Sequence, residues 1–330
     1  MNRPRALNTG ENASVVDRVV SAIFGCDPVT AGGALPRLDG VSEGYFPPGS
    51  MLRHVQSHRA VGQTYGQRAL IIGATHPVPY VGTSQSTLAR ERPFERLART
   101  ALAFETVFFA PREEADRLLG AVRGMHRRVR GELDRDEGTF AAGTPYDAFD
   151  PELMLWTMAM LADSSRVAFE TLVRPLSRAE RDDLWADWVR FGVLFGMPED
   201  VAPADSAAFE RWMQGWYDGG RMHLTEEARA VGRAIATDMP VPWPMTPGIR
   251  MTNLTVIGML PAPVRDLFGL RWTPAHAAAW RSLTAAVRAS QRVVPDRVRL
   301  GDNADLHRLV IRTERAAAAR GRRTIDLPAA

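Results

Sequence analysis

The segment Asp150-Pro-Glu-Leu-Met-Leu-Trp156-Thr-Met158-Ala-Met-Leu-Ala-Asp163 lies near the middle of a chain of 330 residues. Aspartate before proline is typical of a helix start, because the carboxylate accepts hydrogen bonds from first-turn N–H groups and proline fits the first helical position. The helix predicted over about 151–173 is apolar almost all round, which indicates a helix that runs through the interior. Asp163 is costly to bury alone, so it should find an arginine or backbone partner.

Helical periodicity continues on both sides of this central helix. The sequence predicts further helices at 51–56, 66–75, 94–109, 113–130, 178–195, 206–219, 225–237, 249–259, 261–268 and 274–290. Glycine and proline separate them, and no stretch alternates with period two for long enough to predict a sheet. We therefore expect an all-α protein with globin-like helical packing around the central helix. Its single large domain would span 46–303, between an N-terminal arm at 1–45 and a basic C-terminal tail at 304–330.

Local signals agree with these helices. Ser177 and Glu180 have the spacing of a capping box before one helix, and Thr225 can cap another. In the helix at 113–130, apolar residues recur three and four positions apart, and His126 falls on their stripe. His126 should therefore face the core, with Arg123 at the edge of the same face.

The composition excludes several classes of chemistry. All 41 basic residues are arginine, so the chain has neither a Schiff-base lysine nor a phosphate-loop lysine. The net charge of +3 is small and the charges are interspersed, so we expect no nucleic-acid partner, and we expect the arginines at 312–323 to lie on a solvated terminal helix. The single cysteine, Cys26, suits a reducing cytoplasm. Neither a secretory signal nor a membrane-spanning segment is expected.

His126 and Met158 are the side chains in the centre of the chain that could bind a metal through a cofactor. Imidazole and thioether groups are both axial ligands of heme iron, and both residues should point inward. Met158 could equally join Met154 and Met160 as deformable filler of the core. Both interpretations of Met158 stay open at the level of the sequence.

Seven segments resemble the family of latex-clearing-protein and MpaB-type oxygenases, the rubber oxygenase-like proteins. They occur in the family's order between about residues 51 and 300. The segments are Ala69-Leu-Ile-Ile-Gly-Ala-Thr-His76-Pro77, Pro93-Phe-Glu-Arg96-Leu-Ala-Arg99-Thr100, Arg123-Gly-Met-His126-Arg-Arg-Val-Arg-Gly131, Tyr146-Asp-Ala-Phe-Asp150-Pro151-Glu152-Leu153-Met-Leu-Trp156, Pro175-Leu-Ser177-Arg-Ala-Glu180, Gly258-Met-Leu260-Pro261 and Arg265-Asp-Leu-Phe-Gly269-Leu-Arg-Trp272-Thr-Pro274.

The resemblance implies an all-helical fold with a b-type heme between core helices, and the use of O2 on very apolar substrates. It places Arg123 and His126 on the distal side of the heme. The family's proximal histidine, two residues after the tryptophan of the central helix, is Met158 in this sequence. Three interpretations follow: Met158 binds the iron opposite His126 or water, His126 is the proximal ligand while Met158 lines the pocket, or the heme has been lost.

Other residues have candidate roles in the same site. Arg96, Arg99 and Thr100 share a helix face and could hold an anion such as a heme propionate, or they could form an ordinary salt-bridged face. His76, at a helix end before Pro77, could touch the heme edge, although a structural role as a protonated group at the helix C-terminus is the simpler interpretation.

Two weaker patterns favour ordinary structural roles. His54 and His58 are four residues apart but lack a third metal ligand, so they are expected to be solvated. The acidic sequence Asp182-Asp183-Leu-Trp-Ala-Asp187 superficially resembles a magnesium diphosphate motif. It stands at a capped helix start, where acidic residues are favoured in any case.

The function predicted first is that of a cytoplasmic, heme b-dependent oxygenase acting on an apolar, isoprenoid- or polyketide-like small molecule in secondary metabolism. Arg123 would polarise oxygen or a substrate carbonyl. The alternative is a heme-free isomerase or cyclase, dependent on Mg2+ and diphosphate, with His126 and Asp163 as acid–base groups. A third possibility is a heme or lipid carrier without turnover.

Overall fold

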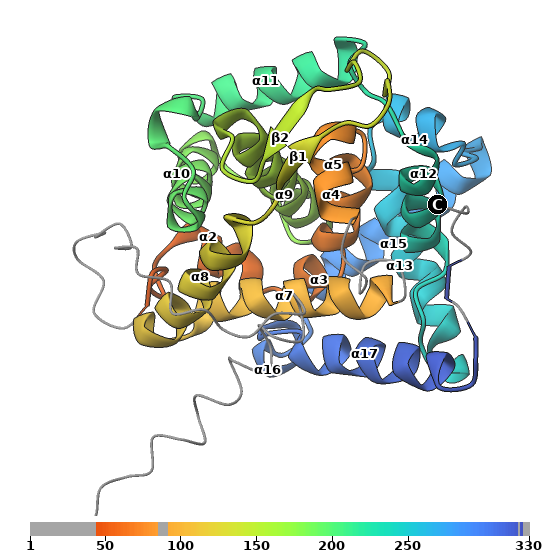
Figure 1. Cartoon of the computed structure of the whole chain (residues 1–330). Coiled ribbons are helices and arrows are strands. Elements are labelled where there is room, and N and C mark those ends of the chain that lie inside the picture. The colour runs from red at the N-terminus through yellow and green to blue at the C-terminus, as the bar shows by residue number, and fades with distance from the viewer. Residues whose placement is uncertain (1–43, 85–91, 323, 326–330) are drawn as a thin grey trace, which may run out of the picture.

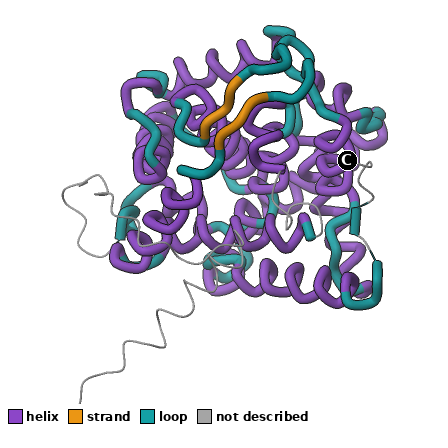
Figure 2. Tube along the Cα trace, in the orientation of Figure 1, coloured by secondary structure: helices purple, strands orange, loops and turns teal. Residues whose placement is uncertain are grey.

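The computed structural model describes residues 44–84, 92–322 and 324–325. Helices surround a central helix on all sides, and one small two-stranded sheet lies at the top of the view (Figures 1 and 2). The all-α prediction is confirmed. The predicted arm at 1–45, with Cys26, lies almost wholly outside the described residues.

The elements follow one another along the chain with short connections. They are α2 (Met51–Ser57), α3 (Arg59–Gly62), α4 (Tyr65–Gly73), α5 (Pro77–Ser84), α7 (Pro93–Phe109), α8 (Arg112–His126), β1 (Arg130–Glu132), β2 (Pro145–Asp147), α9 (Pro151–Leu172), α10 (Arg178–Phe195), η1 (Glu199–Val201), α11 (Ser206–Asp218), α12 (Glu226–Thr237), η2 (Trp243–Met245), α13 (Thr246–Met259), α14 (Ala262–Phe268), α15 (Pro274–Ser290), α16 (Asp296–Arg299) and α17 (Ala304–Ala318).

Helix α9 is the central helix that the sequence predicts. Its N-cap is Asp150, whose side chain accepts a hydrogen bond from the Leu153 backbone N–H. Trp156 and Phe169 are at most 1% exposed, and α9 packs against α4, α10, α3, α15 and α11. A helix that is apolar all round can be stable only in such a position, where every face is covered.

The predicted caps of α10 and α12 are present. Ser177 and Glu180 form a complete capping box at the start of α10, and the Thr225 hydroxyl accepts from Ala228 N–H at the start of α12. Each cap satisfies N–H groups that the first helical turn leaves without partners. These boundaries depend on residues within one turn, so the sequence alone predicts them.

The helix predicted at 113–130 is too long. Helix α8 ends at His126, and the chain then forms an antiparallel hairpin in which Gly131 is opposite Tyr146. A Cβ atom at residue 131 would lie 2.5 Å from the Tyr146 hydroxyl oxygen, so this close crossing requires glycine. Three-residue strands are too short to produce a recognisable period-two pattern, which is why the sequence predicts no sheet here.

Helix α17 carries most of the basic C-terminal segment and packs along α7. The buried Glu314 carboxylate accepts hydrogen bonds from the backbone N–H groups of Phe94 and Glu95 at the start of α7. Arg315 forms an ion pair with Glu95 at 2.7 Å. An acidic group at a helix N-terminus interacts favourably with the helix dipole, so Glu314 helps to fix α17 on α7.

No helix in the described ranges is long and apolar enough to cross a membrane.

Candidate functional site

His126 ends α8 on the inner side of the molecule. Its Nδ1 atom is buried and has no hydrogen-bond partner among the described residues. Burial lowers the pKa of the imidazole to about 4, so it is neutral near pH 7. The Phe149 ring lies edge-on at 5.9 Å between ring centroids. A neutral imidazole with an unused nitrogen in apolar surroundings is suited to ligate a metal or to accept a proton.

Met158 lies on α9 and is 3% exposed. A Cβ atom built at Gly192 of α10 would lie 3.3 Å from the Met158 Cγ atom and 2.7 Å from Cε of Met197. The absence of a side chain at residue 192 therefore leaves room that the two methionine side chains fill. This geometry favours the interpretation of Met158 as part of the packing between α9 and α10.

Phe149 contacts both His126 and α10. A Cβ atom at Gly196 would lie 3.0 Å from the Phe149 ring and 3.8 Å from Cε of Met154. Gly196 has a φ of +111° and closes α10 in the left-handed conformation that favours glycine. Phe149 therefore contacts both His126 and the end of α10, while the Met158 side chain extends toward Gly192 of α10.

The arginines of α7 have different surroundings although they are three residues apart. Arg99 donates to Glu95 through both Nε, at 2.9 Å, and Nη2, at 2.5 Å. Arg96 forms no ion pair with any described residue; burial lowers its pKa, and Tyr80 partly opposes that effect. Arg99 is therefore already neutralised, whereas Arg96 is a cation available to an anionic ligand.

Arg123 and Thr100 complete the group predicted around these residues. Arg123, three residues before His126 on α8, has no ion pair or side-chain hydrogen bond within the described parts of the chain. The Thr100 hydroxyl donates to the Arg96 backbone carbonyl at 3.1 Å. Thr100 is thus satisfied within its own helix, and Arg123 resembles Arg96 in lacking a protein counterion.

His76 lies in an aromatic stack and is 2% exposed. Its ring lies 4.6 Å from the Trp216 ring and 5.0 Å from the Phe140 ring, between centroids, with near-parallel planes. Burial lowers its pKa to about 3, with a smaller effect from the nearby Arg221 charge. The expectation of a protonated histidine at the helix end is wrong, because aromatic neighbours replace the water that would stabilise the charge.

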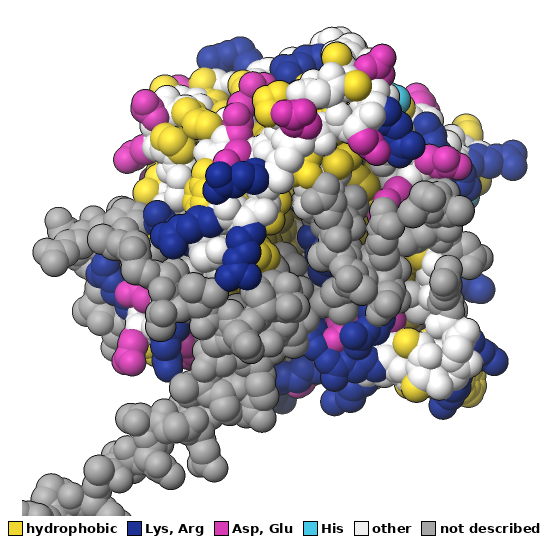
Figure 3. Space-filling model, viewed as in Figure 1, with side chains coloured by type: hydrophobic (Ala, Val, Ile, Leu, Met, Phe, Trp, Pro, Cys, Tyr) yellow, Lys and Arg dark blue, Asp and Glu magenta, His cyan; other side chains and the backbone are white. Residues whose placement is uncertain are grey.

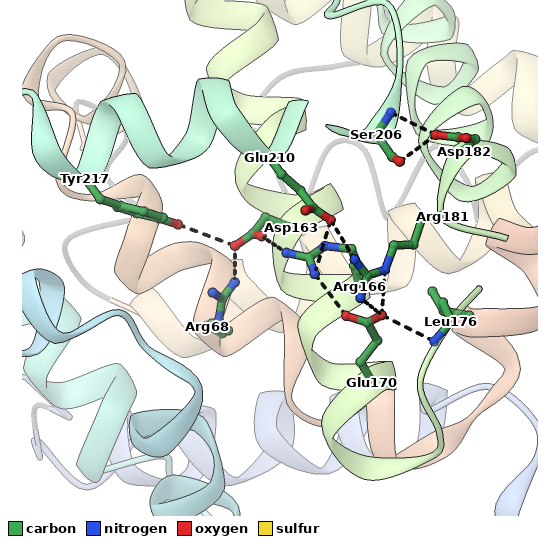
Figure 4. A network of polar contacts seen from close by, with 10 residues as sticks. All are labelled: Arg68, Asp163, Arg166, Glu170, Leu176, Arg181, Asp182, Ser206, Glu210 and Tyr217. Carbon is green, nitrogen blue, oxygen red and sulfur yellow. Dashed lines mark hydrogen bonds and ion pairs between the residues drawn. The ribbon is translucent and has the colours of Figure 1, made fainter. Parts of the chain in front are cut away.

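Asp163 lies at the centre of a buried ionic network, the Asp163 network (Figure 4). Its carboxylate is 2.8 Å from Arg68 of α4 and 2.8 Å from Arg166 of α9. Burial alone would raise the pKa of Asp163, but the two guanidinium groups outweigh burial and hold it below its usual value. The predicted arginine partner is confirmed, and a carboxylate held as an anion by two arginines is poorly suited to acid–base catalysis.

The acidic motif at 182–187 is engaged in packing. Asp182 accepts from the Ser206 hydroxyl at 2.5 Å and the Ser206 N–H at 3.1 Å (Figure 4). Asp187 accepts from the Leu52 N–H at 3.0 Å. The described residues contain no group of three or more His, Cys, Asp or Glu side chains placed to hold a metal ion. The geometry therefore does not favour the magnesium-dependent cyclase.

The prediction that His58 is solvated is wrong. His58 is 2% exposed rather than solvated, and its ring lies 5.3 Å from the His54 ring and 5.2 Å from the Phe169 ring, between centroids. Burial lowers its pKa to about 4, helped by repulsion from neighbouring cationic groups. His58 begins α3 directly after α2, and no local pattern reveals that this junction lies against α9.

Comparison with known proteins identifies the family. The catalytic-domain model described as "ER-bound oxygenase mpaB/B'/Rubber oxygenase" matches residues 53–289. The chain belongs to this oxygenase family. The match covers α3 to α14 completely and contains His126, Met158, Arg96 and Arg123.

Two curated relatives are similar over much of their length. They are the uncharacterized proteins Rv2237 of Mycobacterium tuberculosis and Mb2261 of Mycobacterium bovis, each 31% identical over 212 residues, which is 63% of this chain and 78% of theirs. No solved structure matches the chain.

Three side chains, those of His126, Arg96 and Arg123, have the chemistry that a heme would need. A b-type heme needs an axial donor and cations for its propionates. His126 offers a neutral imidazole with a buried nitrogen that has no partner, and Arg96 and Arg123 lack carboxylate partners among the described residues. The Met158 thioether is a second donor of suitable chemistry, but its side chain packs toward Gly192.

Proposed function

We propose that this member of the oxygenase family is a heme b-dependent oxygenase that acts on an apolar small molecule of isoprenoid or polyketide type. The observation that carries the proposal is the neutral His126 imidazole, whose buried Nδ1 atom has no partner within the described residues. A buried polar atom without a partner costs free energy, and a ligand bound at His126 would offset that cost.

In this proposal the His126 imidazole would hold the heme iron, and Arg96 would hold an anionic group of the cofactor. When bound, the heme iron supplies the activation of O2. Arg123, three residues before His126, would orient a polar oxygen of the substrate through its guanidinium N–H groups. The Phe149 ring packs beside the His126 ring and makes that side of the imidazole apolar.

Met158 has a secondary role in this proposal. Its packing against Gly192 and Met197 supports a function as an apolar wall. Because methionine stands where the resemblance implies a histidine, the iron would be held by His126 of α8 and not by a residue of α9. This assignment distinguishes the protein from a relative that keeps histidine on the central helix.

The first test is the ultraviolet–visible spectrum of protein produced with added heme precursor, before and after reduction with dithionite. We expect a Soret band at near-stoichiometric intensity that shifts in His126→Ala and keeps its position in Met158→Leu. A folded protein that stays colourless after supplementation would overturn the heme proposal. A band that shifts only in Met158→Leu would transfer the axial role to Met158.

Consumption of O2 with a panel of apolar isoprenoid and polyketide substrates tests the activity separately. Stoichiometric heme binding without O2 consumption on any substrate would favour the heme carrier.

A further inference from the structure

Five large apolar side chains are strongly exposed in the described parts of the chain. They are Trp243 (84% exposed), Met245 (39%), Met251 (52%), Val293 (80%) and Val298 (57%). Three of them belong to one segment, residues 242–251, which consists of Pro242, η2 and the beginning of α13 and which we name the Trp243 loop. The other two flank Pro295 directly before α16 and within it. Exposed apolar side chains that lie near one another are typical of an interaction surface.

The Trp243 loop holds its apolar side chains on a defined backbone. Prolines stand at positions 242, 244 and 247, and Trp243 begins the short helix η2, which leads directly into α13. Proline restricts the backbone, so little conformational entropy is lost when this loop binds a surface. Trp243 at 84% exposure therefore projects from a stiff turn rather than folding back onto the domain.

The positive charge of the protein is concentrated near the C-terminal end of the described chain. Residues 288–322 contain nine arginines and four acidic residues, a net charge of +5, whereas the whole chain carries +3. Arg312, Arg320 and Arg322 are exposed and have no ion-pair partner in the described residues. Helix α17 turns Val310 and Glu314 inward, so Arg308 and Arg312 face solvent, whereas Arg315 pairs with Glu95.

These features lie along one edge of the molecule. In the view of Figure 1, α16, α17 and the beginning of α13 form the lower edge. Figure 3 shows basic side chains gathered over α16 and α17 at this edge. The edge thus combines arginines with exposed tryptophan, methionine and valine side chains.

We propose that this edge docks on an anionic phospholipid membrane surface, with the Trp243 loop inserted at the level of the headgroups. Tryptophan is favoured at membrane interfaces because its ring is amphipathic. Arginines within a Debye length of anionic lipids are attracted to them. Nucleic acid would also attract the arginines, but phosphates offer no partner for Met245, Val293 and Val298.

The proposal is independent of the heme and of the reaction. It adds a location: the protein lies on a lipid surface, where apolar small molecules accumulate. Docking of this kind does not need a membrane-spanning helix, since interfacial binding depends on exposed apolar area and charge.

The test is co-sedimentation of the full-length protein with phosphatidylcholine vesicles and with vesicles in which about a third of the lipid is anionic phosphatidylglycerol. We expect binding to the anionic vesicles that weakens as salt rises, and little binding to phosphatidylcholine. Trp243→Ser with Met251→Ser should reduce partitioning about tenfold or more. The combined change of Arg312, Arg320 and Arg322 to Gln should remove most of the preference for anionic lipid. All five side chains are exposed, so the fold should be retained.

Arg128→Gln is the matched control, because Arg128 is exposed after α8 and outside this edge; it should leave vesicle binding unchanged. Absence of binding to anionic vesicles would overturn the proposal, as would binding unaffected by the Trp243 and Met251 substitutions. Retention on DNA without binding to vesicles would assign the edge to nucleic acid instead. A change in the sedimentation of lipid-free protein on Trp243→Ser would assign the loop to contacts between copies of the chain.

Discussion

Polar groups are paired around the C-terminal half of helix α9, and some are unpaired near its N-terminal end. Around Asp163, charged groups are paired: Arg68 and Arg166 hold the carboxylate at 2.8 Å each, and Glu170 binds Arg166 and Arg181. Near the other end, His126 Nδ1 has no hydrogen-bond partner among the described residues, and Arg123, three residues earlier on α8, has no ion pair with any of them.

The difference separates a region built for stability from a region built for a ligand. A buried ionic group costs free energy unless it is paired, so the Asp163 network must be complete to be tolerated. Cations without counterions near the His126 end are tolerated when a bound anion supplies the missing partner. Substitutions at the two ends should therefore affect different measurements.

The largest effect is expected at the paired end. Asp163→Ala should reduce the free energy of unfolding by about 3–5 kcal/mol, because Arg68 and Arg166 would lose their buried counterion. Urea denaturation of the protein measures this loss. Asp183→Ala, at an exposed position of α10, is the control and should stay within about 0.5 kcal/mol of the parent. A loss below about 1 kcal/mol for Asp163→Ala would show that the network does not stabilise the fold.

At the unpaired end, His126→Ala should weaken heme binding about 100-fold, equivalent to about 2.8 kcal/mol. The free energy of unfolding of the heme-free protein should not fall in proportion, because the imidazole Nδ1 atom has no partner among residues 44–84, 92–322 and 324–325 to lose. Titration followed at the Soret band measures the affinity. Met158→Leu conserves volume and should change the affinity by less than about threefold. If Met158→Leu weakened heme binding more than His126→Ala did, Met158 and not His126 would be the residue that holds the iron.

Arg96 and Arg99 provide the same comparison on one helix. Arg96→Met should weaken heme binding about tenfold, through loss of a propionate contact, and should leave the heme-free protein as stable as before. Arg99→Met should instead reduce the free energy of unfolding by about 1–2 kcal/mol, since Glu95 loses one of its partners. The comparison fails if Arg96→Met destabilises the heme-free protein more than Arg99→Met does.

The smallest effect concerns pH. Burial holds the pKa of His76 at about 3 in the folded protein, against an ordinary value of 6.5. The unfolded chain therefore binds a proton between pH 6.5 and about 3 that the folded protein does not bind, and stability falls as the pH falls through this window. Urea denaturation measures the free energy of unfolding at pH 7 and at pH 5. The decrease between the two pH values should be about 1–2 kcal/mol smaller in His76→Phe than in the parent protein.

His276→Gln is a suitable control for that experiment. His276 is exposed and forms a capping box with Thr273, and glutamine keeps this cap. Its pH dependence should match that of the parent protein. An equal change in His276→Gln would mean that the pH dependence does not come from the buried histidine.

The sequence predicted the parts of the fold that depend on neighbouring residues. The caps at Asp150, Ser177 and Thr225 and the buried position of α9 follow from hydrogen bonds within one turn and from apolar periodicity. The need for a partner for Asp163 followed from its charge, but its identity did not. Arg68 is 95 positions earlier in the chain, and only the packing of α4 against α9 brings it within 2.8 Å.

The candidate site divides in the same way. Sequence pattern and the resemblance to the oxygenase family selected His126, Met158, Arg96, Arg99 and Arg123, because each stands in a recognisable motif. The tertiary structure decided that Arg99 is paired with Glu95 while Arg96 is not. It also placed His76 in an aromatic stack and left Trp243 exposed. Burial and pairing depend on residues that are distant in the chain, whereas helix formation is decided locally.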